Sequence, residues 1–501
     1  MLQNSISFTP LSLLTSLARP SLTGAVICAL AMSMPSANAQ EPLMQSQPTT
    51  IEVRDVGEIE AVEHTLMVPE NRNNPESREI ALRFVVLPAA QPSGQSPVAY
   101  LAGGPGGSAT GTAQSRRWPL FDALRQDRDV ILLDQRGTGR SDTPPVCTSS
   151  VGWTETDIGN RDTFVQKQVA AFSECEAFWL AEGVDLDGYT TQQSAADIAA
   201  VSEALGEKLS LLGISYGTHL ALAAIKYHPD ALDRVALVGV EGLDQTVKLP
   251  SRTDAYFARL ENALNASRVA AGNEPYPALA PALRTALARI ERDRPVVDMF
   301  VARGRPPIKR TLGAFAVQSA IAFSLADPDR ADDVAQAILA MAADDPDYSF
   351  MVFRGFVMPE RIRMRAMPSI MDIASGVSPD RMQIIEAQAK DALFGDATNF
   401  PMPHLASAGS AYVLPPEFRD DPEGGTPTLI VSGTLDGRTY AESAIEATDG
   451  LTNRSVLTVE NGGHNLFFDH PEVVPSMVAF LRGEPLADNH LVAPLPEATA
   501  R

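Results

Sequence analysis

A serine set between two glycines is the residue in this sequence best suited to covalent chemistry. Residues 213–217 read Gly-Ile-Ser-Tyr-Gly, which is the pattern G-x-S-x-G with Ser215 at its centre. The pattern follows an apolar run at residues 209–212 and precedes an apolar helical stretch at residues 218–227. In that context it predicts a sharp strand-to-helix turn that presents the hydroxyl as a nucleophile. Glycines are needed because a Cβ at either flank would collide with the neighbouring helix or strand.

A histidine and a carboxylate are expected after this serine, because a hydroxyl is a poor nucleophile until a base removes its proton. Asp436 follows the apolar run 428–431, and His464 lies on a glycine loop just beyond the apolar run 456–459. We expect Asp436 to fix the imidazole tautomer, and His464 to act first as a base and later as an acid.

Other interpretations of these two residues stay open. Asp436 precedes Gly437, and Asp-Gly pairs often only form turns, in which case Asp421 or Asp469 would be a weaker substitute. His464 could be an ordinary surface histidine in a loop. The two later histidines of the chain lack a position at the end of a strand, so His464 is the best candidate for the base.

A glycine-rich loop early in the chain can supply the hydrogen-bond donors that acyl transfer needs. Residues 103–108 read Gly-Gly-Pro-Gly-Gly-Ser and directly follow the apolar run 98–101. Backbone N–H groups on such a loop stabilise an oxyanion, and we expect the amides of Gly104 and Tyr216 to be the donors. A phosphate-binding loop is the rival interpretation, but the lysine and the following serine or threonine of a P-loop are absent.

The elements that must position these residues alternate between apolar runs and helical patterns. Apolar, β-branched runs occur at residues 80–87, 98–101, 130–133, 209–212, 235–240, 428–431 and 456–459. This alternation predicts an α/β fold with a mostly parallel sheet flanked by helices. Ser194 can cap a helix that ends at Gly206 and leads into the strand before Ser215.

The strand signals disappear between about residues 243 and 421, where helical periodicity dominates. We therefore expect the first part of the sheet domain in residues 40–242, an inserted helical cap in residues 243–421, and the rest of the sheet domain in residues 422–501. At 501 residues and 45% hydrophobic content, the chain can bury one large core and carry such an insertion.

The first 39 residues are expected to be a signal peptide. Their single charged residue is Arg19, residues 21–34 form an apolar run, and Ala37-Asn38-Ala39 is a small-x-small cleavage site. Cleavage after Ala39 predicts a periplasmic or secreted protein, and a disordered amino-terminal tail is the alternative. No later segment holds about 20 uninterrupted apolar residues, so we expect no membrane span.

The cysteines and the net charge narrow the possibilities further. Cys28 leaves with the signal, so the mature chain keeps Cys147 and Cys175. Two thiols in an exported protein suggest one disulfide, and two unrelated buried cysteines are the alternative. A formal net charge of −22 opposes binding to nucleic acid. The cysteine and histidine spacings form no metal-ligand cluster, and no organic cofactor is indicated.

Four motifs occur here in an order known from one enzyme family. They are residues 103–107, the Asp-Gln-Arg-Gly-Thr-Gly-Arg-Ser of residues 134–141, residues 213–217, and the Gly-Gly-His of residues 462–464. In these motifs the chain resembles the proline iminopeptidase and tripeptidyl aminopeptidase family of α/β-hydrolases, most closely its secreted tripeptidyl-aminopeptidase-like branch. The resemblance covers roughly residues 50 to 485. It implies the α/β-hydrolase fold with an inserted cap, and a triad formed by Ser215, Asp436 and His464. Many proline iminopeptidases carry a histidine where this chain has Ala102.

The resemblance and the residues together predict an aminopeptidase that releases amino-terminal residues or short peptides through an acyl-enzyme on Ser215. Such an enzyme must hold an α-ammonium group. Glu241 and Asp244, at the entry to the cap, are the candidate carboxylates, and solvated loop acids are the alternative.

Two other functions use the same fold. A carboxylesterase or amidase acting on small or hydrophobic acyl substrates would need the same triad. A non-catalytic binding protein is a third hypothesis, which the retention of both Ser215 and His464 opposes. Ser215 also opposes a dehalogenase or an epoxide hydrolase, since those enzymes use an aspartate nucleophile. The sequence gives no indication of an oligomeric state.

Overall fold

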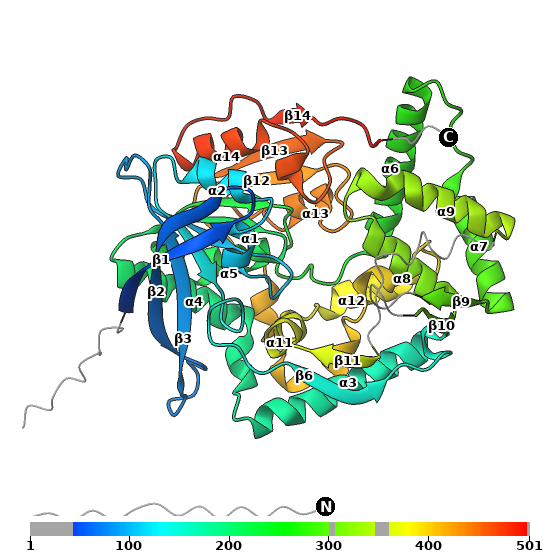
Figure 1. Ribbon diagram of the computed structural model, residues 1–501, viewed down its shortest axis with the longest axis horizontal. Helices are drawn as coiled ribbons and strands as arrows, with labels where there is room; N and C mark the ends of the chain where they lie inside the picture. Colours follow the sequence, from blue (N-terminus) through cyan, green and yellow to red (C-terminus); the bar gives the residue numbers. More distant parts are fainter. Residues whose placement is uncertain (1–43, 300–305, 346–359, 498–501) are drawn as a thin grey trace, which may run out of the picture. The chain divides into compact units, whose positions relative to one another are not determined.

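The computed structural model describes residues 44–299, 306–345 and 360–497, and its centre is a ten-stranded sheet (Figure 1). Its strands, in sheet order, are β1 (Met44–Val53), β2 (Gly57–Pro69), β3 (Glu79–Leu87), β5 (Val130–Asp134), β4 (Val98–Leu101), β7 (Leu209–Ile214), β8 (Leu232–Val238), β12 (Thr428–Gly433), β13 (Arg454–Glu460) and β14 (His490–Val492). The strands from β1 to β5 pair antiparallel, and all the remaining pairs are parallel.

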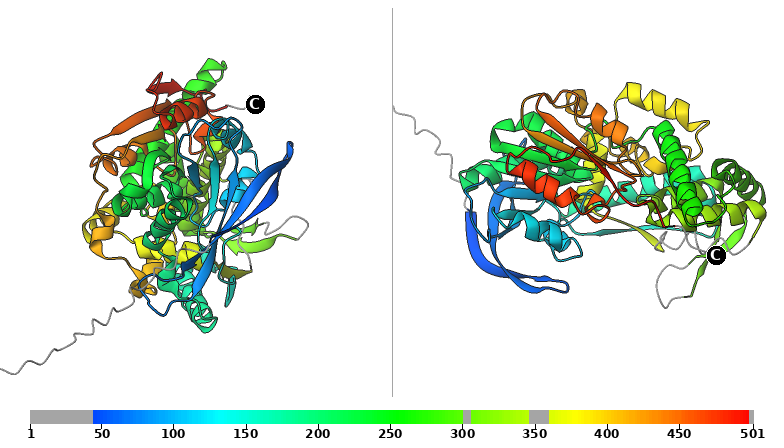
Figure 2. Two further views of the ribbon diagram at one scale, coloured as in Figure 1. Left: turned by 90° about the vertical axis from the view of Figure 1, so that its left-hand side faces the viewer. Right: turned by 90° about the horizontal axis from the view of Figure 1, so that it is seen from above.

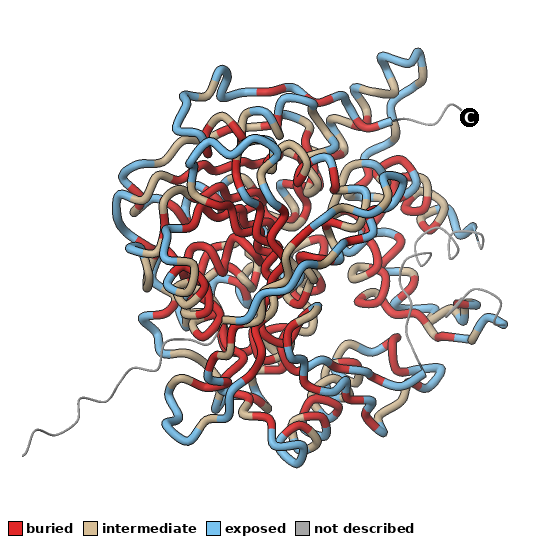
Figure 3. The backbone as a smooth tube through the Cα atoms, turned by 60° about the vertical axis from the view of Figure 1, so that its left-hand side comes forward, coloured by how far each residue is buried: buried red, intermediate tan, exposed pale blue. Residues whose placement is uncertain are grey.

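Every residue of β4, β5, β7 and β12 is buried, which explains why these strands are continuous apolar runs in the sequence. The predicted fold class, a mostly parallel sheet flanked by helices, is confirmed. Figure 3 shows buried stretches throughout the interior of the molecule and exposed ones mainly along its outer turns. The β1–β2 hairpin lies at the edge of the sheet, drawn in dark blue in Figure 2.

Helices cover both faces of the sheet. One face packs against α1 (Ala109–Ala113), α2 (Trp118–Leu124) and α14 (Val473–Leu481), and the other packs against α4 (Thr191–Leu205) and α5 (Tyr216–Tyr227). The helices α4 and α5 come directly before and after β7 in the chain. Their packing against the sheet therefore holds the turn that carries Ser215.

The start of α4 differs from the prediction. Thr190, and not Ser194, is the N-cap, and its hydroxyl accepts a hydrogen bond from the backbone N–H of Gln193. Ser194 lies buried within the first turn, so the sequence pattern placed the cap one turn too late. The predicted end is correct, because Gly206 has φ of +74° and closes the helix in the left-handed region.

The region between residues 243 and 421 is mainly helical but contains short strands that the sequence did not indicate. Among its described residues the α-helices are α6 (Pro250–Ala270), α7 (Leu279–Asp293), α8 (Ala314–Ser324), α9 (Ala331–Ala343), α11 (Ala366–Ser375) and α12 (Pro379–Ala389). The strands β9 (Val296–Met299) and β10 (Ile308–Thr311) pair with each other. A third strand, β11 (Arg361–Met364), pairs with β6 (Cys147–Gly152), which precedes the Ser215 turn in the chain (Figure 1). The boundary proposed at residue 243 therefore stays a prediction.

A disulfide joins Cys147 on β6 to Cys175 on α3 (Arg161–Ala181), with a Cα–Cα distance of 5.5 Å. The disulfide therefore links β6, the strand that pairs with β11, to the neighbouring helix α3. The expected signal peptide, its cleavage after Ala39 and Cys28 lie outside the described residues. Within the described ranges, no helix combines the length and apolar character needed to cross a bilayer.

Candidate active site

The turn between β7 and α5 holds Ser215 in a strained conformation. Its φ of +55° and ψ of −127° lie where non-glycine residues are rare and cost free energy. A Cβ at Gly217 would overlap the carbonyl oxygen of Leu101, and one at Gly213 would come within 2.5 Å of the Gly217 oxygen. Only glycine fits at both flanks, so the turn has the geometry that the G-x-S-x-G pattern predicts.

The glycine loop after β4 packs directly on this turn. A Cβ at Gly103 would lie 2.9 Å from the Cβ of Ser215, and the N–H of Gly107 donates to the Gly103 oxygen at 3.0 Å. Gly104 has φ of +129°, and Tyr216 is the first residue of α5, where the N–H has no partner within the helix. These two amides flank the serine, and their assignment as oxyanion donors stays a prediction.

His464 and Asp436 meet at the carboxyl edge of the sheet. The Nδ1 atom of His464 lies 2.9 Å from Oδ2 and 3.1 Å from Oδ1 of Asp436, whose side chain is fully buried. The same carboxylate accepts hydrogen bonds from the Thr439 hydroxyl at 2.6 Å and from the N–H groups of Arg438 and Thr439. These bonds hold the carboxylate in a single orientation toward the imidazole.

Opposing effects set the pKa values of this pair. Burial pushes the pKa of Asp436 upward, but the charge and hydrogen bond of His464, together with the Thr439 bonds, lower it below its usual value. Burial pushes the pKa of His464 downward, while the Asp436 charge and hydrogen bond raise it above 6.5. The pair therefore favours a carboxylate that stabilises an imidazolium.

Ser215 and His464 line one pocket with a volume of about 590 Å³, within the usual range of ligand sites. No direct hydrogen bond joins their side chains in the described part of the chain. Catalytic hydrogen bonds are often long in unliganded proteins and tighten when substrate binds. The pocket thus brings together the three predicted triad residues, with Asp436 reaching it through His464.

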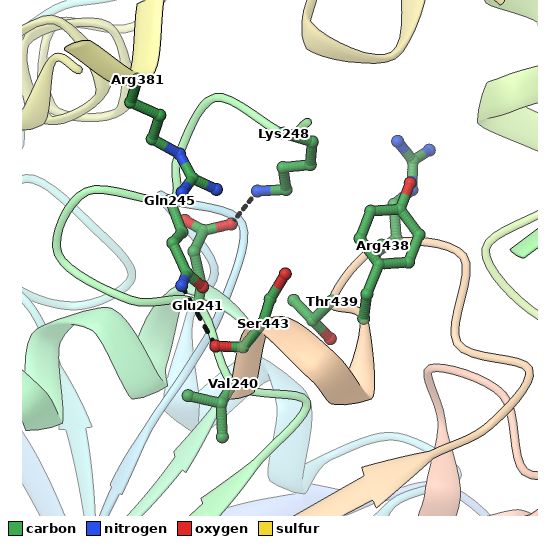
Figure 4. A pocket seen from close by; sticks show the side chains of 9 residues that line it. Val240, Glu241, Gln245, Lys248, Arg381, Arg438, Thr439 and Ser443 are labelled. Atoms are coloured by element: carbon green, nitrogen blue, oxygen red, sulfur yellow. Dashed lines mark hydrogen bonds and ion pairs between the residues drawn. The ribbon is translucent and has the colours of Figure 1, made fainter. Parts of the chain in front are cut away.

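The two carboxylates expected to bind an ammonium group are placed differently. Glu241 lines the pocket of Ser215. Its carboxylate forms an ion pair with Lys248, which Figure 4 draws in a view of a second, smaller pocket beside Thr439. Asp244 does not line it, because its carboxylate accepts hydrogen bonds from the N–H and the hydroxyl of Ser378 at the start of α12. In the structure this carboxylate anchors the start of α12, and a role of Asp244 in binding substrate stays a prediction.

Asp372 is a pocket residue that no sequence motif indicates. It lies on α11 and faces the pocket that holds Glu241. Burial, reinforced by the charge of Glu241 and opposed by Lys248, raises the pKa of Asp372 to about 7. The available signal was an acid that is the one charged residue of α11, since its neighbours Met371 and Ile373 are fully buried.

A second missed feature connects the region before α9 to the base. Asp327 accepts hydrogen bonds from the backbone N–H of Asn465 at 2.8 Å and from its side-chain amide at 2.6 Å. The amide oxygen of Asn465 then accepts a hydrogen bond from Arg117, which also donates to the Tyr100 hydroxyl at 3.3 Å. The loop that carries His464 is held in place by this chain of contacts. No group of three or more possible metal ligands occurs in the part of the chain that the structure describes.

Residues 97–280 match the family model described as the alpha/beta hydrolase fold. A tripeptidyl aminopeptidase of Streptomyces coelicolor is 30% identical over 158 residues, which make up 29% of this chain and 28% of the relative. The chain therefore spans less than a third of the length of the curated relative that it matches. The matched family region contains the glycine loop, the Ser215 turn and Glu241.

Matches among solved structures include an esterase from Exiguobacterium antarcticum and epoxide hydrolase A from Mycobacterium thermoresistibile. The esterase is 14% identical with a TM-score of 0.35, and the match covers 83% of this chain and 98% of the esterase. The epoxide hydrolase is 16% identical with a TM-score of 0.37, and the match covers 88% of this chain and all of the other.

Proposed function

We propose that this chain, an α/β-hydrolase by its fold, is an exported serine hydrolase that releases amino-terminal residues or short peptides. One observation carries the proposal. A single pocket is lined by Ser215, by His464 bonded to Asp436, and by the two carboxylates of Glu241 and Asp372. A nucleophile beside carboxylates suits a substrate with a free amine close to the bond that is cleaved.

In the proposed reaction His464 takes the proton of Ser215 as its oxygen attacks the scissile carbonyl carbon. The N–H groups of Gly104 and Tyr216 stabilise the oxyanion that forms. The tetrahedral intermediate collapses when His464 protonates the leaving amine, which leaves an acyl-enzyme on Ser215. Water, deprotonated by His464, then hydrolyses the ester and restores the serine.

Glu241 and Asp372 are proposed to hold the α-ammonium group of the substrate. Lys248 neutralises Glu241 in the structure, so the three groups together retain one negative charge when Asp372 is ionised. An incoming ammonium matches that charge. Its approach favours the ionised form of Asp372, so substrate binding lowers the pKa of that carboxyl from about 7.

Export is part of the proposal because the chain contains a disulfide between Cys147 and Cys175. Structural disulfides form and persist in oxidising compartments, such as the periplasm and the extracellular medium. The segment of residues 243–421 is proposed to act as the cap over the pocket, since Lys248, Phe323 and Asp372 all line it from that segment.

A carboxylesterase or amidase is the second candidate, and the apolar lining of the pocket favours it. Phe323, Phe400 and Met402 line the same pocket as Ser215. These side chains would accept a hydrophobic acyl group, which the same triad would transfer to water.

The test compares turnover of aminoacyl and tripeptidyl chromogenic amides, their N-acetylated forms and short acyl esters. A peptidase of the proposed kind cleaves the free amines, spares the acetylated forms and is inactive as Ser215→Ala. Glu241→Gln and Asp372→Asn should each raise KM for free amines, whereas Asp244→Asn, which lies outside the pocket, should not. Turnover of esters alone would support a serine hydrolase but would reject the peptidase assignment.

A further inference from the structure

The pocket is locally rich in positive charge although the protein is acidic. The whole chain carries 40 lysines and arginines against 62 aspartates and glutamates. Among the described residues the pocket lining reverses that balance, because Arg117, Lys248 and Arg438 line it together with two acids, Glu241 and Asp372. Cations concentrated at one site of an acidic protein indicate a ligand that carries negative charge.

Lys248 is paired with Glu241, but the two arginines have no carboxylate partner within 4 Å among the described residues. Arg117 donates to two neutral acceptors, the Tyr100 hydroxyl and the Asn465 amide oxygen. The side chain of Arg438 donates to the backbone oxygen of Phe323 at 3.2 Å. A guanidinium has five N–H donors, so most donors of both side chains remain for a ligand.

Both guanidinium groups are also held over aromatic rings. Arg117 lies 5.8 Å from the ring centre of Phe467, and Arg438 lies 5.2 Å from that of Phe323. A cation over a ring face is stabilised and loses rotational freedom. The two side chains are therefore oriented before any ligand arrives, which lowers the entropic cost of binding an anion.

Both arginines contact residues that position the base: Arg117 lies at the start of α2, and Arg438 lies on the loop of Asp436. Arg117 is bonded to Asn465, the residue directly after His464, and the backbone N–H of Arg438 donates to Asp436. The Glu241–Lys248 pair comes from a different loop, after β8, and Figure 4 draws it on the opposite side of Thr439 from Arg438. His464 protonates the leaving group, so a substrate group near the arginines belongs to the leaving side.

We propose that Arg117 and Arg438 form a carboxylate-binding site for the leaving group, so that the enzyme prefers short peptides whose leaving residue is anionic. This inference rests on the proposed peptidase function, since it assigns the leaving side of that reaction. The carboxylate is either the free carboxyl terminus of a short peptide or the side chain of an aspartate or glutamate. The two sources share one chemistry, recognition by charge-assisted hydrogen bonds from guanidinium.

The test measures peptide binding to Ser215→Ala by calorimetry, so that no turnover is needed. The ligands are di-, tri- and tetra-alanine, the same peptides as carboxyl-terminal amides, and the amides with aspartate as the last residue. At least one free acid should bind about tenfold to a hundredfold tighter than its amide, the scale of charge-assisted hydrogen bonds. Recovery of affinity by the aspartyl amide would assign the side-chain source, and its absence would assign the carboxyl terminus.

Variants in the same background decide whether the arginines cause this preference. Arg117→Gln and Arg438→Gln should each reduce the ratio of acid to amide affinity toward one, and Arg117→Lys should keep part of it. Arg116→Gln is the matched control, because Arg116 is exposed, stacks on Phe468 and does not line the pocket. Melting temperatures within a few degrees of the parent would exclude misfolding as the cause.

Equal affinity for acids and amides, no binding by any free acid, or a preference that survives in both glutamine variants would overturn the inference. These outcomes are distinct from failure of the peptidase itself. That failure would be seen as turnover of esters alone by the wild-type chain, whatever the calorimetry shows.

Discussion

The carboxylate of Asp327 holds the backbone N–H of Asn465 at 2.8 Å and its side-chain amide at 2.6 Å. Asn465 directly follows His464, so an acid from the segment between α8 and α9 fixes the loop of the proposed base. The charge of Asp327 also helps to raise the pKa of His464, although less than Asp436 does. Asp327 is thus a positioning residue for the proposed reaction.

We expect Asp327→Asn to reduce kcat by about tenfold to a hundredfold, because small displacements of a catalytic group are costly. Loss of the negative charge should also lower the pKa of His464, so the acid limb of the kcat/KM profile should move to lower pH. Asp329→Asn is the control, since this exposed neighbour makes the same charge change without bonding Asn465. A loss of rate with an unmoved profile would indicate a purely structural role.

Asp436→Asn should lower kcat by about 10³ to 10⁴ if this carboxylate orients the base, the size of loss found for such acids. The pKa of His464 should fall, because the raising influence of Asp436 is removed. Asp469→Asn is the matched comparison, because the Asp469 carboxylate accepts a hydrogen bond from the Gly463 N–H at 2.7 Å rather than bonding His464. A larger loss in the Asp469 variant than in the Asp436 variant would reassign the acid.

Seven strands of the sheet can be predicted from the sequence, and the reason is their burial. Strands covered on both faces are continuous apolar runs, as β7 and β12 are. The β1–β2 hairpin escapes prediction because it is largely exposed and carries outward acids such as Glu52 and Glu60. Strands that exist only through distant pairing, such as β11 against β6, leave little local signal.

The candidate site divides in a similar way. Ser215, Asp436 and His464 each follow an apolar run, and this local context is visible in the sequence. Asp372 and Arg117 reach the pocket only because distant segments fold together, and no short motif records that. Asp244 lies close to Glu241 in sequence but does not line the pocket, because its carboxylate accepts hydrogen bonds from Ser378.

Asp372→Asn should change both stability and its pH dependence. The folded-state pKa of Asp372 is raised to about 7, so the ionised carboxyl destabilises the native state. In the wild type, the protonated Asp372 carboxyl makes its full contribution to the free energy of unfolding below pH 4, near the pKa of the unfolded chain. That contribution is lost as the pH rises toward 7. The variant should therefore gain on the order of 2 kcal/mol over the wild type at pH 8, after discounting for partial exposure, and little at pH 4.

Urea unfolding of both proteins at pH 4, 6 and 8 would measure this difference. A constant difference across the range would contradict a raised pKa for Asp372. The same variant should lose one ionisation from the acid limb of kcat/KM for free-amine substrates, since both Asp372 and His464 must lose a proton for activity. For ester substrates that lack an amine, the acid limb of the kcat/KM profile should be the same in the wild type and the variant.

Gly217→Ala should destabilise the fold by roughly 3 kcal/mol or more, because its new Cβ would overlap the backbone oxygen of Leu101. Backbone cannot rearrange there without moving β4 or α5. Gly425→Ala is the control, since its Cβ would meet only the Thr452 hydroxyl at 3.8 Å. Thermal unfolding followed by circular dichroism would compare the two variants, and equal melting temperatures would contradict the close approach of Gly217 to Leu101.

The disulfide between Cys147 and Cys175 should stabilise the folded protein mainly by restricting the conformations of the unfolded chain. The bridged residues are 28 positions apart, and closing a loop of that length stabilises a protein by about 3 to 4 kcal/mol in the chain-entropy relation. Cys147→Ser with Cys175→Ser should therefore lower the denaturant midpoint, and a reducing agent should lower the wild-type midpoint similarly. The double variant serves as the control, because it should not respond to the reductant.

Because β6 pairs with β11, which lies in the segment that lines the pocket, substrate KM should rise along with the loss of stability. A variant as stable as the wild type would show that packing between β6 and α3, and not the bond, holds this region together.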